Sequence, residues 1–175
     1  MTQPHPARTT VNWRDRVVVF LAFLTSSECL DACKRQARPE ELAGALTRIW
    51  FDDIYVPGEE YVDGLKGTNR DEHITVFNAC FSEEERESLA RFHGFFELRL
   101  DFLTNSVLGR GFFPENDSWQ SILKHASYLL DELDPEPDWV RHMLASLASQ
   151  PPRLLVSSLR GHTLPSQCTT GAPTR

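Results

Sequence analysis

Apolar residues recur three and four positions apart through most of the chain, which is the spacing of one face of an α-helix. Six segments show this pattern, beginning near Trp13, Pro39, Asp71, Ser82, Asp117 and Pro135. The segment from Ser82 is the longest and extends to about Leu108. The pattern predicts an all-α fold, an irregular or orthogonal bundle of five to six helices.

Capping signals mark several of the expected helix ends. Ser82 followed by Glu85 has the form of a capping box, in which each side chain bonds the other residue's backbone N–H. Thr25 and Glu28 have the same spacing, so we expect the first helix to break there and restart toward Gln36. These signals place the helix boundaries more firmly than the apolar pattern alone.

The two ends of the chain lack this periodicity. Residues 1–10 contain two prolines, and residues 151–175 contain four prolines among Ser, Thr and Gly. Such segments bury too little apolar surface to offset the entropy of ordering. We expect a disordered leader over residues 1–10, a helical domain over residues 11–150 and a mostly disordered tail over residues 151–175.

Acidic residues concentrate in the middle of the chain. The net charge is −7 overall, and residues 51–102 carry five basic and thirteen acidic side chains. A nucleic-acid backbone is bound through Lys and Arg, so we expect no nucleic-acid partner. Charge complementarity favours a protein partner with a basic surface instead.

The compartment follows from the apolar runs and the cysteines. The longest apolar run, Val17 to Leu24, has eight residues, whereas about 20 are needed to span a bilayer. Asp15 before this run and the absence of a small-residue cleavage site after it argue against a signal peptide. We therefore expect a cytoplasmic protein with no membrane partner and with reduced thiols, including Cys29 and Cys33 as small core residues.

Sequence signatures of common enzyme classes are absent. There is no phosphate-binding G-x-x-x-x-G-K loop, no G-x-S-x-G nucleophile turn and no H-E-x-x-H metal motif. Gly109-Arg110-Gly111 begins like a dinucleotide fingerprint, but it lies between two predicted helices and is interpreted as a turn. No cofactor is expected.

A polar stripe on the long helix is the first candidate for chemistry. His93, Glu97 and Asp101 recur every four residues, with apolar residues on both sides of the stripe. A helix that is apolar on two sides is expected to be largely buried, and buried polar groups need partners. Gly94, next to His93, would let another element approach closely.

A matching feature lies in the helix predicted from Pro39 to about Tyr55. Asp53 falls on the apolar face of this helix. If the two helices cross, Asp53 meets His93, Glu97 and Asp101 in one cluster, which could act as general acid and base or hold a divalent metal. The alternative is a structural network neutralised by an arginine such as Arg99. Whether a metal is bound is left open.

Aromatic residues in two predicted loops are the second candidate. Phe112 and Phe113, between Gly111 and Pro114, either plug the end of the bundle or stand exposed as a docking point. Tyr61 lies in an acidic loop that would form the rim of a site. His125 has no polar companion in the sequence and is expected at an ordinary surface or core position.

The leading functional hypothesis is a non-catalytic regulatory or adaptor protein that binds another protein through Phe112, Phe113 and Tyr61. The alternative is an acid–base or metal-assisted hydrolase or lyase that uses the cluster of Asp53, His93, Glu97 and Asp101. A solvent-reachable cavity at that cluster would favour the enzyme. A sealed network would favour the binding protein.

Overall fold

All regular structure in the part of the chain that the structure describes is helical. The computed structural model describes residues 12–35, 38–58, 70–106 and 116–149. Its helices are α1 (Trp13–Thr25), α2 (Ser27–Lys34), α3 (Pro39–Arg48), the π-helix η1 (Ile49–Ile54), α5 (Arg70–Asn78), α6 (Glu83–Ser106), α7 (Asp117–Leu133) and α8 (Pro137–Ala148).

The all-α prediction is confirmed over these residues. They contain seven α-helices, one more than the upper number predicted. The break expected after Thr25 is confirmed, but Ser26 and not Thr25 is the cap of α2. The Ser26 Oγ accepts a hydrogen bond from the Cys29 amide at 3.3 Å. The expected disordered ends, residues 1–10 and 151–175, lie outside the described residues. No described helix is both long enough and apolar enough to cross a bilayer.

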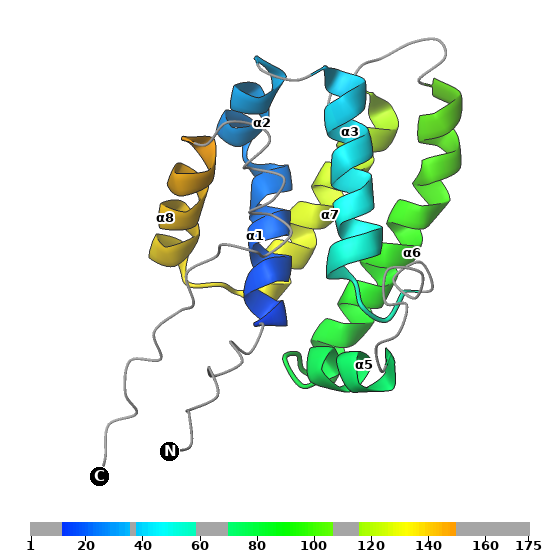
Figure 1. The fold of residues 1–175 in the computed structure, drawn as a ribbon, viewed down its shortest axis with the longest axis vertical. Coiled ribbons are helices and arrows are strands. Elements are labelled where there is room, and N and C mark those ends of the chain that lie inside the picture. The colour runs from blue at the N-terminus through cyan, green and yellow to red at the C-terminus, as the bar shows by residue number, and fades with distance from the viewer. Residues whose placement is uncertain (1–11, 36–37, 59–69, 107–115, 150–175) are drawn as a thin grey trace, which may run out of the picture.

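Helix α1 forms the centre of the bundle. It contacts α2, α7, α8 and η1, and Figure 1 shows it with α8 on one side, α3 and α7 on the other and α2 above its upper end. The eight residues from Val17 to Leu24 are each at most 2% exposed. A helix surrounded by other helices is apolar around its whole circumference. This explains why the longest apolar run in the sequence belongs to a core helix.

Aromatic side chains fill the space between α1, η1 and α6. Trp50 is fully buried and stacks on Phe20 and Tyr55, with ring centroids 5.5 and 5.6 Å apart. The ring of Phe92 from α6 meets it edge-on at 4.9 Å. Offset and edge-to-face pairs at these separations stabilise a core beyond the area they bury.

The segment after α3 departs from the regular helix predicted to Tyr55. Residues Ile49–Ile54 form a π-helix, and the Tyr55 amide donates to the Trp50 carbonyl five residues earlier at 3.0 Å. The wider turn buries four apolar side chains, those of Ile49, Trp50, Phe51 and Ile54. The prediction of one continuous α-helix is wrong here, because the hydrogen bonds of Ile49–Ile54 span five residues instead of four.

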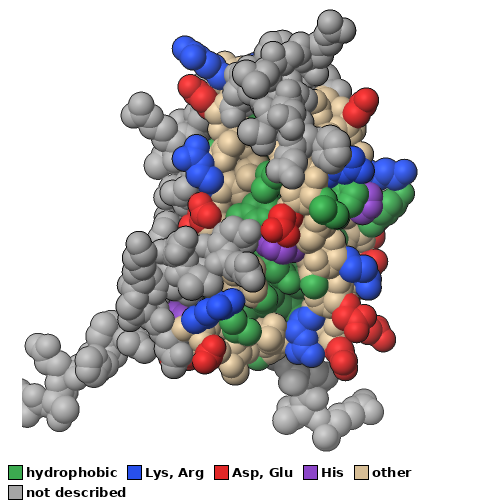
Figure 2. Space-filling model, turned by 90° about the vertical axis from the view of Figure 1, so that its right-hand side faces the viewer, with side chains coloured by type: hydrophobic (Ala, Val, Ile, Leu, Met, Phe, Trp, Pro, Cys, Tyr) green, Lys and Arg blue, Asp and Glu red, His purple; other side chains and the backbone are tan. Residues whose placement is uncertain are grey.

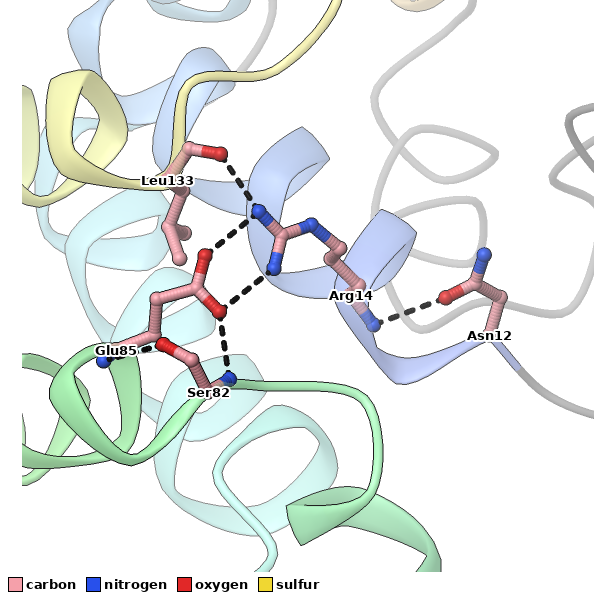
Figure 3. Close-up of polar contacts among 5 residues, drawn as sticks. All are labelled: Asn12, Arg14, Ser82, Glu85 and Leu133. Atoms are coloured by element: carbon pink, nitrogen blue, oxygen red, sulfur yellow. Dashed lines mark hydrogen bonds and ion pairs between the residues drawn. The ribbon is translucent and has the colours of Figure 1, made fainter.

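A polar clamp joins three helices that are distant in the sequence (Figure 3). The Arg14 guanidinium on α1 bonds both carboxylate oxygens of Glu85 on α6, with Nη1–Oε2 at 3.0 Å and Nη2–Oε1 at 2.7 Å. Its Nη2 also donates to the Leu133 carbonyl at the end of α7, at 2.7 Å. This carbonyl is one of those that a helix C-terminus leaves without an intrahelical donor. The clamp therefore fixes the start of α6 and the end of α7 against α1.

The predicted capping box of α6 is part of this clamp. The Ser82 amide donates to Glu85 Oε2 at 2.8 Å, and the Glu85 amide donates to Ser82 Oγ at 3.2 Å. These bonds, above all the one from Arg14, lower the pKa of Glu85 below its ordinary value of 4.5. Glu85 therefore caps its own helix and binds α1 with the same carboxylate.

Candidate functional site

The two segments predicted to cross at the carboxylate–histidine cluster do meet, through aromatic rings. The His93 ring on α6 stacks on Tyr55 at 4.3 Å and lies 4.9 Å from Phe51 on η1. His93 is half-buried between these rings. Burial raises the pKa of Tyr55 above its ordinary value of 10, so its hydroxyl stays protonated at neutral pH.

The other residues of the predicted cluster differ in their exposure. Asp53 is half-buried, but Glu97 is exposed, and Leu98 beside it is 72% exposed. Helix α6 is therefore not buried on two sides, and the expectation of a buried Glu97 is wrong. Asp101 lies in the last turns of α6, whose side chains are outside the description. Among the described side chains, no three His, Cys, Asp or Glu residues gather where they could hold a metal ion.

The glycine next to His93 does not serve a close contact. A Cβ atom built on Gly94 would meet nothing within 4 Å. The expectation that another element approaches α6 at this point is therefore wrong. The proposed docking residues Phe112, Phe113 and Tyr61 lie outside the described residues, so their role stays a prediction.

A groove on the other flank of α6 was not predicted. It runs between α6 and α7 and has a volume of about 400 Å³. It is lined by Ser88, Arg91, Phe92, Phe95, His125, Tyr128, Leu129 and Glu132. Figure 2 looks onto the side where α6 lies, and at its right-hand margin hydrophobic and histidine side chains meet Lys and Arg side chains.

Three rings form the walls of this α6–α7 groove. Phe95 on α6 stacks on His125 on α7, with centroids 3.8 Å apart and planes within 20°. The His125 ring lies 6.2 Å from Tyr128, one turn along α7. Tyr128 is 52% exposed. The groove thus presents an aromatic surface that is open to solvent.

One hydrogen bond fixes the tautomer of His125. Its Nδ1 lies 2.8 Å from the Ser121 carbonyl oxygen one turn earlier. A carbonyl oxygen can only accept, so Nδ1 carries the proton and Nε2 of the neutral ring is an acceptor. The ring therefore offers a partner one hydrogen-bond acceptor in a fixed direction.

Cations border the aromatic walls. Arg91 lines the groove and donates to Ser88 Oγ at 2.7 Å, and its Nη1 lies 3.9 Å from Glu87. The Arg99 guanidinium lies 5.0 Å from the centre of the Phe95 ring, and Lys124 Nζ lies 5.8 Å from that of Tyr128. Cations at such distances are attracted by the electron-rich ring faces.

The sequence contained part of the signal for this groove. His125 was expected to lack companions, yet Tyr128 follows it at helical spacing, and Arg99 follows Phe95 in the same way. Residues three or four apart on a helix are neighbours. What periodicity could not provide is the pairing of α6 with α7, which brings Phe95 onto His125.

Comparison with known proteins gives no family for this chain. No protein-family model matches it, and neither a curated protein nor a solved structure shows significant similarity.

Proposed function

We propose that the protein acts by binding another protein through the α6–α7 groove, without chemistry of its own. The aromatic ladder of Phe95, His125 and Tyr128 along an open hollow carries this proposal. Aromatic residues and arginine are enriched at the energetic centres of protein interfaces, where they fill or form pockets. The groove combines both, because Arg91 lies on its wall.

Exposed apolar surface beside the groove supports the same proposal. Tyr128 is 52% exposed, and Leu98, one turn after Phe95 on α6, is 72% exposed. Fully covering one such side chain contributes about 1.5–3 kcal/mol. Two such anchors contribute about 3–6 kcal/mol before the cost of association, less than the roughly 8 kcal/mol of a micromolar complex. The proposed interaction is therefore weak and reversible unless further contacts add to it.

The observations favour binding over the acid–base alternative. The candidate catalytic histidine, His93, packs between Tyr55 and Phe51, and the proposed carboxylate Glu97 faces solvent. A general base must lie within hydrogen-bond reach of the proton that it abstracts. The two rings limit the directions from which a substrate could reach His93, and the exposed Glu97 lies in water instead of in an enclosed site.

The test compares two surface variants of the full chain. Tyr128→Ser removes a groove wall, and Val76→Ser on α5 removes a different exposed apolar side chain, 39% exposed. Proteins that the unaltered chain captures from the cells that produce it are purified. The affinity of each for the unaltered chain and for the two variants is then measured directly. We expect a partner that binds the unaltered chain and the Val76→Ser variant equally but binds Tyr128→Ser at least about tenfold more weakly. Equal affinity of every purified partner for both variants would refute the proposal.

A further inference from the structure

Cationic side chains gather around the α6–α7 groove although the chain as a whole is acidic. Arg91, Arg99 and Lys124 border the groove, whereas the chain carries a net charge of −7. The carboxylates of Glu132, in the lining, and of Glu87, beside Arg91, lie near these cations. Other exposed acids gather at the start of α5 and α6, namely Asp71, Glu72, Glu83 and Glu84.

Arg91 retains the capacity to bind a carboxylate. Its side chain is 67% exposed, and its nearest approach to Glu87 is 3.9 Å, which is longer than a charge-assisted hydrogen bond. Its Nη2 donates a hydrogen bond to Ser88 Oγ, and a guanidinium carries five N–H donors in a planar fork. An incoming carboxylate would meet this fork on the wall of the groove.

We infer that the groove binds a peptide segment in which a large apolar side chain is flanked by Asp or Glu. The apolar side chain lies against Phe95 and Tyr128, the carboxylate pairs with Arg91, and a peptide N–H donates to Nε2 of His125. This inference rests on the proposed function and names its partner. The segment that binds in the groove is acidic. The basic partner predicted from the overall charge would instead bind at the acidic start of α5 and α6.

Charge also argues against the chain's own tail as the occupant. Residues 151–175 carry three basic and no acidic side chains, so the cations at the groove would repel them. A second copy of the chain is a different outcome, and the test distinguishes it by the oligomeric state.

The experiment selects peptides from a displayed library of random short segments on the full chain. The best peptides are then synthesised and their dissociation constants measured. We expect acidic residues next to a Phe, Trp, Leu or Met, and binding that weakens as salt is raised. Arg91→Gln should weaken binding about tenfold, as expected for the loss of a charge-assisted pair.

A charge reversal with a matched control makes the test decisive. Arg91→Glu should turn the selected preference from acidic to basic peptides. Arg141→Glu is the control, because Arg141 on α8 is also exposed and pairs with an acid on its own helix, Asp138, at 2.8 Å. It should leave the preference unchanged.

Each remaining outcome decides between the two proposals. The selected peptides could be basic or uncharged and still bind Tyr128→Ser more weakly than the unaltered chain. This result would overturn the inference of an acidic segment but would still support the groove as a binding site. Three further outcomes would also overturn the inference. The selected peptides could bind the Tyr128→Ser variant as well as the unaltered chain, or none could bind with a dissociation constant below about 1 mM. The free chain could also form a dimer that Tyr128→Ser dissociates.

Discussion

Replacing Glu85 by Gln removes the negative charge from the clamp of Figure 3 while keeping the size of the side chain. Gln can still accept the hydrogen bond from the Ser82 amide, since Gln also serves in capping boxes. It can accept one bond from Arg14 but not the charge-assisted pair. The substitution therefore isolates the ionic part of the contact between α1 and α6.

The expected loss of stability depends on how far the Arg14–Glu85 pair is shielded from water. The side chains of Arg14 and Glu85 are 34% and 18% exposed. Fully exposed pairs contribute about 0–1 kcal/mol, and breaking a fully buried pair costs about 3–5 kcal/mol. We expect Glu85→Gln to lower the free energy of unfolding by about 1.5 kcal/mol, a fall of about 5 °C in Tm for a domain of this size.

The effect should depend on pH in a definite direction. The pKa of Glu85 in the folded state is lowered, mainly by the bond from Arg14, so the charged carboxylate stabilises the fold. This contribution is fully present above the ordinary pKa of 4.5. It is lost as the pH falls through the lowered folded-state pKa. The unaltered chain and Glu85→Gln should therefore converge in stability in acid.

The assay is thermal unfolding across this pH range, with Glu84→Gln as the control. Glu84 lies in the same first turn of α6 but is exposed, so its loss removes only the interaction with the helix dipole, about 0.5 kcal/mol. Equal shifts for the two variants would refute the reasoning. So would a difference between Glu85→Gln and the unaltered chain that persists in acid.

Further predictions concern single positions. Gly94→Ala should raise the free energy of unfolding by about 1 kcal/mol in chemical denaturation, because the site is helical and open; a fall would indicate an unrecognised contact. Asp134→Gly should raise it by about 0.5–1 kcal/mol, because Asp134 has φ 41° at the end of α7. Glu97→Gln should change it by less than about 0.5 kcal/mol, since the side chain is exposed; a loss of several kcal/mol would restore the buried network. Burial, and to a lesser extent Cys29, raises the pKa of the Cys33 thiol to about 11, so native alkylation monitored by mass spectrometry should modify Cys33 far more slowly than the half-exposed Cys80.

Local signals in the sequence predicted the helices well. The Ser82–Glu85 capping box forms as its spacing indicates, because capping needs only residues within one turn. The π-helix escaped prediction, since a search at the α-helical period assumes a constant pitch. The exposure of Leu98 was not predicted for a different reason. Hydrophobicity alone does not reveal which of two apolar flanks of a helix has a neighbour.

The candidate site was predicted only in part. The sequence placed His93 near the segment around Asp53, and the structure brings His93 onto Tyr55 and Phe51 of that segment. It did not reveal the stacking of Phe95 on His125, because that contact joins two helices whose relative placement depends on the whole bundle. Pairing across helices is a tertiary property, and one sequence carries no direct record of it.

The central position of α1 has a consequence for synthesis of the chain. Arg14 and the Leu133 carbonyl that it bonds are 119 residues apart, and α1 packs against α7 along its length. At about 5–20 residues per second, a ribosome takes on the order of ten seconds to produce the covering helix after α1. During that interval the apolar surface of Val17–Leu24 lacks its final neighbours. Exposed apolar segments of this kind invite aggregation during synthesis. We therefore expect substitutions that slow the docking of α7 to lower the yield of folded protein even where they leave its final stability unchanged.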